Sequence, residues 1–518
     1  MLHENIGSFL TRRAQRGPKL EAIVEPEKGR RVTYAELNAR SNQAAAALLA
    51  NGIRTGDRLA ILLTNRAEFV ESYFAAAKIG AIIVPLNWRL VADELQFILK
   101  DSGATGLIYD SVYDATVEAL QQRGNDVKTW IRVAGTYPSP RCCNSYEDLL
   151  AGSAGAEPAL GASDDDLLFI MYTSGTTGRP KGVMQTHETM LWASTTWNMT
   201  CDMRYRDRHL IVLPLFHIGG LLPLTAAIHR GQTVVLLHSA DTDNILRTIE
   251  QEKINVTHIV TTMLRRILAS SGGQPDRTSL RWAIVGGEAV PATLTRQAAD
   301  AGIEVLQDYG LTEACGPVTI ITSEDALDKA DSCGGPHFHT EVRVVAPDGR
   351  DVVPGQVGEV IVRSRHVMKG YWNRPDATAE ALKGGWLYTG DLGVIDADGC
   401  LSIRDRMKDM VISGGENIYP AEVEHVIASH PRVKEVAIIG QPSAKWGESP
   451  VAVVVTTNGE ALDSEEMIAF CRDKIAGFKI PRHVELVEEL PRTPTGKIQK
   501  HLLRARFPGP AQIGRAHV

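Results

Sequence analysis

Residues 167–182 of the chain, LLFIMYTSGTTGRPKG, join a short apolar run to a loop of glycine, hydroxyl and cationic residues. The run Leu167–Tyr172 predicts a buried strand, because short apolar runs bounded by turn residues are typical of covered sheets. In the loop, glycines let backbone N–H groups approach an anion, hydroxyls donate hydrogen bonds and Lys181 adds positive charge. The stretch therefore predicts a strand followed by a phosphate-binding loop. It is not a Walker A loop, because Gly182 stands where that motif needs Ser or Thr.

The same alternation of apolar strands and helical patterns extends on both sides of this stretch. The expected strands are Arg58–Leu63, Ala81–Leu86, Thr105–Tyr109, Leu167–Tyr172, Leu210–Leu213, Thr233–Leu237, Val256–Val260, Trp282–Val285 and Glu304–Leu306, with helices at Glu68–Ile79 and Ala92–Lys100. Strands separated by helices indicate βαβ units. The pattern predicts an α/β fold with a large N-terminal domain of two covered, mostly parallel sheets.

The pattern changes near residue 341. Short β runs parted by turn signals, at Glu341–Val345, Gly358–Val362 and Leu401–Ile403, predict a β subdomain over about 336–405. A compact α+β unit is expected next, with a helix at 420–429, strands at Glu435–Ile439 and Val451–Thr456, a helix at Ser464–Ile475 and a strand at Val484–Leu486. The predicted domains are 1–405, 406–507 and a tail, 508–518. Because residues 513–518 resemble a translated sequencing adapter, we hypothesise that this tail is an artefact.

Composition excludes several classes of protein. Of 518 residues, 44% are hydrophobic and 23% charged, as in an ordinary soluble globular protein, and the net charge of −7 does not favour nucleic acid as a partner. The seven cysteines show no CxxC spacing and no signal-peptide core follows the N-terminus, so we expect a cytoplasmic protein with reduced thiols. The longest apolar stretch, 210–228, contains His217 and two prolines and favours a strand, a turn and a helix over a membrane span.

Seven further motifs follow the loop along the chain. They are Pro214–His217 (PLFH), Gly286–Glu288 (GGE), Asp308–Glu313 (DYGLTE), Tyr388–Asp391 (YTGD), Asp405–Asp409 (DRMKD), Ser413–Pro420 (SGGENIYP) and Pro494–Lys497 (PTGK). Together with the loop they resemble the adenylate-forming superfamily of acyl- and aryl-CoA synthetases, luciferases and peptide-synthetase adenylation domains. The sequence is most similar to the bacterial stand-alone fatty-acid and acyl-CoA synthetases.

The resemblance implies an AMP-forming acid–thiol ligase. A carboxylate first joins the α-phosphate of ATP and pyrophosphate leaves, and the thiol of CoA then attacks the acyl-adenylate and releases AMP. The first step brings two anions together, so charge neutralisation is expected to dominate catalysis. The implied cofactors are ATP, Mg²⁺ and CoA as co-substrate, and the implied partner is a small-molecule carboxylic acid.

By the same resemblance, several motifs bind the nucleotide. The implied residues are Thr173, Ser174, Gly175, Thr176, Thr177, Gly178 and Lys181 at the phosphates, Gly287, Glu288, Asp308, Tyr309 and Gly310 at the adenine slot, and Asp391 with Arg406 at the ribose. Thr312 is expected to contact phosphate, and Glu313 to hold Mg²⁺, which prefers carboxylate and phosphate oxygens. A threonine N-cap followed by a first-turn glutamate is the structural alternative for this pair.

The C-terminal domain is expected to serve the two half-reactions in turn. Lys497 bridges the α-phosphate and the carboxylate in the first, although a solvated surface lysine is the commoner fate. In the family this domain then rotates about the position occupied here by Lys408. The rotation brings Gly414, Gly415 and Glu416 to the adenylate, where a glycine pair suits close approach of the narrow pantetheine arm.

The acid substrate is expected to lie beside the PLFH motif. For His217 three roles are open: an aromatic gate beside the acyl carboxylate, a general base, or a buried core histidine. The acyl pocket is assigned to Ile218, Gly219 and Leu222. Because Gly219 leaves space and offers no donor, a medium- or long-chain fatty acid is our first hypothesis, with an aryl acid of the cinnamate or benzoate type as the alternative.

Other functions share parts of this pattern. A luciferase has the same motifs, and a non-catalytic nucleotide-binding protein would have the loop without Glu313 or Lys497. Two basic clusters, Arg12, Arg13 and Arg16 with Arg204, Arg206 and Arg208, suggest peripheral contact with anionic lipid, or else a solvated face. We expect a monomer or a homodimer.

Overall fold

The structure is a computed structural model of the full chain. It describes residues 4–133, 143–173, 180–239, 241–270, 276, 278–287, 290, 292–322, 324–330, 332–406, 411–418, 420–457, 462–491, 498 and 500–509. In this part of the chain, no helix combines the length and the apolarity that crossing a membrane requires.

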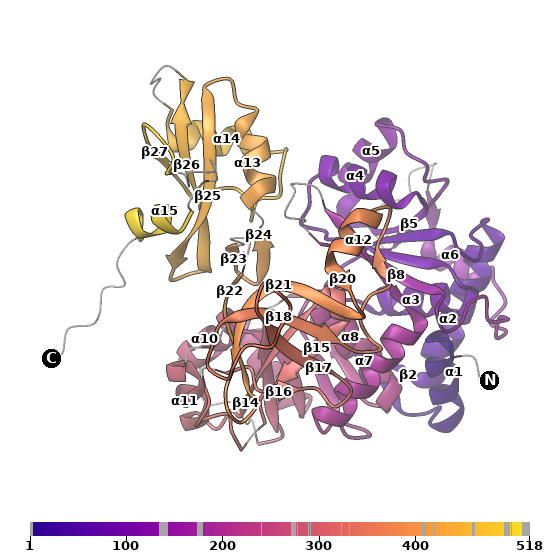
Figure 1. The fold of residues 1–518 in the computed structure, drawn as a ribbon. Coiled ribbons are helices and arrows are strands. Elements are labelled where there is room, and N and C mark those ends of the chain that lie inside the picture. Colours follow the sequence, from indigo (N-terminus) through magenta and orange to yellow (C-terminus); the bar gives the residue numbers. More distant parts are fainter. Residues whose placement is uncertain are drawn as a thin grey trace. The chain divides into compact units, whose positions relative to one another are not determined.

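The chain divides into two compact units (Figure 1). The first contains Met1–Trp88, Ile98–Tyr172 and Gly182–Arg404, and the second contains Arg89–Phe97, Thr173–Lys181 and Asp405–Val518. The predicted domain limits, 1–405 and 406–507, stay a prediction.

Helices and parallel strands alternate through most of the first unit. Its α-helices are α1 (Gly7–Arg16), α2 (Tyr34–Ala50), α3 (Ala67–Ile79), α5 (Asp114–Gln122), α6 (Tyr146–Ala151), α7 (His187–Thr200), α8 (Ile218–Arg230), α9 (Thr242–Gln251), α10 (Thr261–Ala269), α11 (Ala292–Asp300) and α12 (Pro375–Ala381), and α4 (Ala92–Ser102) spans both units. Short 3₁₀ turns are η1 (Pro26–Lys28), η2 (Ser111–Tyr113) and η3 (Thr312–Ala314).

Two large sheets organise this unit. The first has the strand order β16-β15-β14-β13-β12-β10-β11-β1-β2. Its strands are β1 (Glu21–Glu25), β2 (Arg30–Thr33), β10 (Arg208–Ile211), β11 (Thr233–Leu236), β12 (Val256–Val260), β13 (Trp282–Gly286), β14 (Val305–Leu311), β15 (Gly316–Ile320) and β16 (Gly335–Pro336). Pairing is parallel from β1 to β14 and antiparallel at both edges.

The second sheet has the order β19-β9-β8-β4-β3-β5-β6-β7. Its strands are β3 (Arg58–Leu62), β4 (Ile82–Pro85), β5 (Ala104–Asp110), β6 (Thr129–Val133), β7 (Asn144–Ser145), β8 (Leu167–Thr173), β9 (Lys181–Thr186) and β19 (Gly370–Tyr371). A smaller sheet, β17-β18-β21-β20 with β22 on β21, forms the β subdomain. It consists of β17 (Glu341–Val345), β18 (Gly358–Arg363), β20 (Leu382–Lys383), β21 (Trp386–Ile395) and β22 (Leu401–Arg406).

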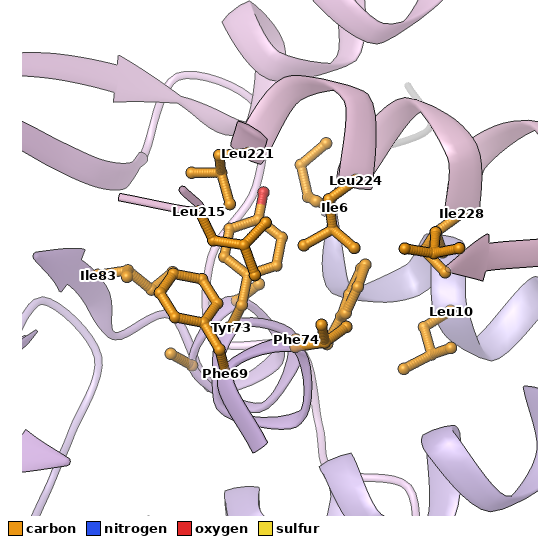
Figure 2. Close-up of a cluster of buried hydrophobic side chains, with 14 of the residues drawn as sticks. Ile6, Leu10, Phe69, Tyr73, Phe74, Ile83, Leu215, Leu221, Leu224 and Ile228 are labelled. Carbon is orange, nitrogen blue, oxygen red and sulfur yellow. The ribbon is translucent and has the colours of Figure 1, made fainter. Parts of the chain in front are cut away.

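A shared apolar core holds α8, the helix that carries the predicted acyl-pocket residues. Figure 2 shows Phe69, Tyr73 and Phe74 of α3 gathered with Leu221 and other α8 side chains. Every residue of α3 is buried. The Thr225 hydroxyl also donates a hydrogen bond to the Tyr73 hydroxyl, 3.1 Å away. Close packing of this kind buries α8 from Gly220 to Ile228.

The second unit contains a mixed sheet ordered β24-β23-β26-β25, with β27 pairing parallel to β26. Its strands are β23 (Val411–Ser413), β24 (Glu416–Ile418), β25 (Val433–Ser443), β26 (Gly447–Thr456) and β27 (His483–Leu486), and its helices are α13 (Pro420–Ala428), α14 (Ser464–Cys471) and α15 (Lys500–Arg506). Val411, Ile427, Ile438, Val454 and Met467 belong to its buried core.

The predicted fold class is confirmed: mostly parallel covered sheets, a β subdomain and a smaller α+β unit. One predicted helix was too long. The pattern from Ser464 to Ile475 suggested continuous helix, but α14 ends at Cys471. The chain is extended at Arg472, where ψ is 143°, and Asp473 has φ 64°. Neither conformation continues a right-handed helix.

The C-cap of α3 offers a test of the close packing. Gly80 has φ +75°, and a Cβ there would lie 2.7 Å from the backbone of Gly161. The left-handed conformation alone costs about 1–2 kcal/mol for another residue, and overpacking adds about 1–3 kcal/mol. We expect Gly80→Ala to lower the urea midpoint clearly more than Gly52→Ala, since Gly52 has φ +86° with nothing within 4 Å. Equal shifts for the two variants would contradict this packing argument.

Candidate active site

Strand β14 and the turn η3 bring several predicted nucleotide residues together. The Tyr309 hydroxyl donates a hydrogen bond to Asp391 Oδ2 over 2.6 Å, which joins the DYGLTE and YTGD motifs. Asp391 lies on β21 and only 3% of it is exposed. Its backbone N–H donates to the Thr389 hydroxyl at 3.1 Å. The carboxylate is therefore held in place and suits hydrogen bonds from the two hydroxyls of a ribose.

The next residues form the candidate phosphate and metal site. Thr312 begins η3, and its carbonyl accepts a hydrogen bond of 2.7 Å from Gln185 Nε2. Glu313 Oε1 accepts one of 2.9 Å from the Tyr371 hydroxyl, and its carbonyl accepts another from the Met368 N–H. Neither Gln185 nor Tyr371 was predicted. Each reaches η3 from the second sheet, where β9 and β19 pair, and no local pattern around either residue marks that meeting.

The carboxylate of Asp308 lies away from this group. Its Oδ1 is 3.5 Å from His258 Nε2, whereas its neighbour Tyr309 contacts Asp391. Successive side chains of a strand point to opposite faces of the sheet, so the two residues serve different sides. The structure thus brings Tyr309 and Asp391 together, but it does not bring the Asp308 side chain to them.

Glycines allow close approaches around the same strand. A Cβ on Gly310 would lie 2.1 Å from the carbonyl oxygen of Gly316, so β14 and β15 come together only without that atom. A Cβ on Gly316, which has φ +113°, would lie 2.6 Å from Leu222 Cδ2. Two of the predicted acyl-pocket residues, Ile218 and Leu222, are therefore neighbours of the turn between these strands.

The space beside Gly219 has mixed character. A Cβ there would lie 3.3 Å from Leu213 Cδ1 and 3.7 Å from His258 Cε1. The fatty-acid hypothesis assumed an apolar space at this position. The structure places the buried imidazole of His258 there, so one side of the space beside Gly219 is polar.

His217 is the residue before α8 and caps it without a side-chain hydrogen bond to the backbone. Its ring lies 4.5 Å from the ring of Phe216, which in turn contacts Trp88 edge-on at 6.0 Å. An aromatic cluster of this kind suits a gate, but the three roles proposed for His217 stay open.

Part of the phosphate loop is described. Thr173 ends β8 and Lys181 begins β9. Ser174, Gly175, Thr176, Thr177 and Gly178 lie outside the described residues, as do Glu288, Lys408, Lys497 and the side chain of Arg406. Gly287 has φ +85°, a conformation that glycine adopts at little cost.

The glycine pair predicted to face CoA forms a tight turn in the second unit, and the local backbone explains why both residues are glycine. Gly414 and Gly415 connect β23 to β24 with φ +60° and +81°. A Cβ on Gly414 would lie 2.8 Å from Trp446 Cε3, and its N–H donates to the Trp446 carbonyl at 2.7 Å. Glu416 is buried at the start of β24. The turn is therefore tight and leaves its backbone without covering side chains of its own.

Three of the six arginines proposed to contact lipid form ion pairs with carboxylates. Arg12 contacts Glu4 at 3.0 Å, Arg204 contacts Asp202 at 2.7 Å, and Arg208 contacts Glu21 at 2.8 Å. Pairing reduces the positive charge that an anionic surface would meet. Membrane contact stays a prediction.

Cys315 follows the candidate metal residue by two positions and is fully buried. Burial raises the pKa of its thiol above the usual value. A buried, protonated thiol is a poor nucleophile.

Comparisons with known proteins agree with this geometry. A family described as AMP-binding enzyme matches residues 10–372, and one described as AMP-binding enzyme C-terminal domain matches residues 422–497. The chain is similar to a long-chain-fatty-acid–CoA ligase of Mycobacterium tuberculosis, with 42% identity over 97% of this chain and 99% of the relative. It is also similar to a feruloyl-CoA synthase of Amycolatopsis sp, with 40% identity over 98% of this chain and 100% of the relative.

Among solved structures, it is similar to a double mutant of o-succinylbenzoate CoA synthetase from Bacillus subtilis, bound to a product analogue. The TM-score is 0.88 at 34% identity, over 98% of this chain and 99% of that one. The protein is therefore an adenylate-forming α/β enzyme. The chain belongs to the AMP-binding enzyme family. This confirms the predicted enzyme class, an AMP-forming acid–thiol ligase, and its cofactor set of ATP, Mg²⁺ and CoA.

The Tyr309–Asp391 pair predicts how AMP affinity responds to mutation. Hydrogen bonds to a charged group contribute about 1.5–3 kcal/mol each, so loss of the charge should weaken AMP binding by about 10- to 100-fold. We expect this loss for Asp391→Asn in isothermal titration calorimetry. Asp348→Asn, in a surface turn beside Arg350, is the control and should bind AMP as the wild type does. Unchanged affinity in Asp391→Asn would exclude a direct role at the ribose.

Proposed function

We propose that the protein is an ATP-dependent carboxylic acid–CoA ligase. The substrate oxygen attacks the α-phosphorus of ATP and the bond to pyrophosphate breaks. The CoA sulfur, after losing its proton, then attacks the acyl carbon, and the bond to AMP breaks. The observation that carries the proposal is the joining of DYGLTE to YTGD through Tyr309 and Asp391, with Glu313 held close by along the same chain segment.

Each described residue has a defined task in the first half-reaction. Asp391 accepts hydrogen bonds from the ribose, and Tyr309 orients Asp391 while its ring packs against the base. Thr312 donates its hydroxyl to a phosphate oxygen. These contacts fix the α-phosphorus for in-line attack, which is the main way that a protein accelerates such a transfer.

The candidate metal site suits Mg²⁺. This ion is usually bound by one or two carboxylates together with substrate phosphates, and it keeps several waters. Within the described ranges no three His, Cys, Asp or Glu side chains form a metal cage, which is consistent with a single carboxylate at Glu313. Tyr371 orients that carboxylate by its hydrogen bond. When bound, Mg²⁺ would neutralise charge on the phosphates.

The class of acid is the finer part of the proposal. Similarity to a fatty-acid ligase and to a feruloyl-CoA synthase supports both of our hypotheses about equally. The imidazole of His258 beside Gly219 favours the aryl hypothesis, because a long alkyl chain gains nothing from a polar wall. We propose an aryl or polar-substituted acid, and the fatty-acid hypothesis stays the alternative.

The direct experiment measures pyrophosphate release and CoA-thioester formation together across C2–C20 fatty acids and several aryl acids. We expect both products with at least one acid. Pyrophosphate without thioester would point to another acceptor. Absence of pyrophosphate with every acid would exclude this function.

Lys497 predicts a separation of the two half-reactions. Removing a cation that neutralises the transition state should slow pyrophosphate release by about 100-fold or more. We expect Lys497→Ala to show this loss while it still converts synthetic acyl-AMP and CoA into the thioester at the wild-type rate. Lys500→Ala is the control, since Lys500 Nζ contacts Glu424 at 2.6 Å and has a structural role. Equal loss in both half-reactions would assign Lys497 a structural role instead.

Gly414 predicts the opposite separation. A methyl group there meets Trp446 and strains a backbone at φ +60°, so the turn must shift. We expect Gly414→Ala to slow thioester formation from acyl-AMP by about tenfold, equivalent to about 1.4 kcal/mol, with pyrophosphate release unchanged. Gly477→Ala, where a Cβ has open space, should leave both rates unchanged. A Gly414→Ala enzyme with full thioester activity would remove this turn from the CoA site.

A further inference from the structure

A cluster of buried polar side chains lies behind the predicted acyl residues. We call it the polar cluster; it consists of Trp197 on α7, His258 on β12, Asp308 on β14 and His337 after β16. Each is no more than 9% exposed. The Trp197 ring centroid lies 5.5 Å from that of His258 and is stacked at 6.0 Å on His337. Asp308 Oδ1 is 3.5 Å from His258 Nε2.

The polar cluster lacks the hydrogen bonds that buried groups normally make. Five of its atoms have no hydrogen-bond partner among the described residues: Asp308 Oδ1, whose contact with His258 Nε2 is an ion-pair distance only, His258 Nδ1, Trp197 Nε1 and both ring nitrogens of His337. Buried polar atoms are almost always paired, so several unpaired ones in one place call for an explanation. His366, another fully buried histidine of this unit, shows the usual state: its nitrogens contact the Ala314 carbonyl at 2.6 Å and the Thr340 hydroxyl at 2.8 Å.

Glycines link the polar cluster to the substrate side of the site. A Cβ on Gly286 would lie 2.0 Å from Asp308 Oδ1, and one on Gly219 would lie 3.7 Å from His258 Cε1. Gly286 precedes the predicted adenine residue Gly287, and Gly219 is an assigned acyl-pocket residue. The unpaired atoms of Asp308 and His258 are therefore next to the two segments between which an acyl-adenylate is expected.

The chemistry of these atoms specifies one kind of ligand group. The Asp308 carboxylate accepts hydrogen bonds, and the Trp197 indole donates one. His337 adds a neutral ring, because burial lowers its pKa to about 3. A neutral imidazole carries one donor and one acceptor. A hydroxyl group has one donor and two accepting lone pairs, so it can pair with the Asp308 carboxylate and with up to two donors of this set. A second carboxylate would face the carboxylate of Asp308, and an alkyl end would leave every atom unpaired.

We propose that Asp308, with His258 and Trp197, forms a subsite that binds a hydroxyl group of the acid substrate. The inference rests on the proposed ligase function and makes Asp308 a specificity-determining residue. It narrows the substrate class to hydroxylated carboxylic acids, with a hydroxyaryl acid as the first candidate. Plain fatty acids are then poor substrates because they leave the polar cluster unsatisfied.

The test compares acids that differ by one hydroxyl. The pairs are 4-hydroxycinnamic with cinnamic acid and 8-hydroxyoctanoic with octanoic acid, and the readout is kcat/KM for pyrophosphate release. A site built to bind a hydroxyl rejects the analogue that lacks it, so we expect the hydroxylated member of the better pair to be preferred by about tenfold or more. Equal kcat/KM within both pairs would leave the ligase function standing and overturn the subsite.

Variants assign the preference to Asp308. We expect Asp308→Leu to lose the preference, because kcat/KM for the hydroxylated acid falls by about tenfold more than kcat/KM for the plain acid. Asp308→Asn keeps the shape of the side chain and an accepting oxygen, so it should fold and show a smaller loss of preference. A preference that survives in both variants would overturn the role of Asp308.

Thr257→Val is the matched control. Thr257 is the neighbour of His258 on β12, points to the opposite face, and donates to the Leu210 carbonyl at 3.1 Å. The Thr257→Val enzyme should prefer the hydroxylated acid over the plain acid to the same extent as the wild type. Thermal shifts with each acid provide a readout independent of turnover, with a larger shift expected from the hydroxylated acid. If no acid releases pyrophosphate in the wild type, the ligase function fails and this inference fails with it.

Discussion

The alternation of side chains along β14 is the constraint on which the site depends. Successive side chains of β14 point to opposite faces of the sheet, so Tyr309 contacts Asp391 on one face and Asp308 lies near His258 on the other. Glycine makes this arrangement possible, because a Cβ on Gly310 would collide with the Gly316 carbonyl across the turn to β15. In our proposal a single strand therefore separates a nucleotide side from an acid side, and the turn η3 that follows carries the candidate metal residue.

The rest of the first unit holds β14 by strand pairing and α8 by core packing. Strands β10, β12, β13 and β14 pair in parallel, and this pairing sets His258 on β12 beside Ile211 and Ile284 of the adjacent strands. Residues of α3 and α8 share one apolar core. Apolar packing buries α8 from Gly220 to Ile228, and a Cβ on Gly219, just before this part, would lie 3.7 Å from His258 Cε1 on β12. The proposed acid-binding residues thus belong to the buried interior of the first unit, whereas the residues expected to act on CoA belong to the other unit.

Local patterns predicted the elements well where they depend on short-range periodicity. Val256–Val260 and Glu341–Val345 are strands with the predicted ends, because apolar alternation and flanking turns mark both limits. The end of α14 was missed, since Arg472 and Asp473 leave the helix without a glycine or proline to signal it. Motifs placed Tyr309 and Asp391 together, but they carry no information on which face Asp308 uses. His258 and Tyr371 were missed because they reach the site through sheet pairings between segments far apart in the sequence.

The buried thiol of Cys315 has a consequence for an enzyme that makes an activated ester. An acyl-adenylate reacts with any accessible thiolate, so a reactive cysteine near Glu313 would capture the acyl group and inactivate the protein by self-acylation. Burial keeps this thiol protonated and out of reach. The fold thereby keeps this thiol from competing with the incoming thiol for the intermediate.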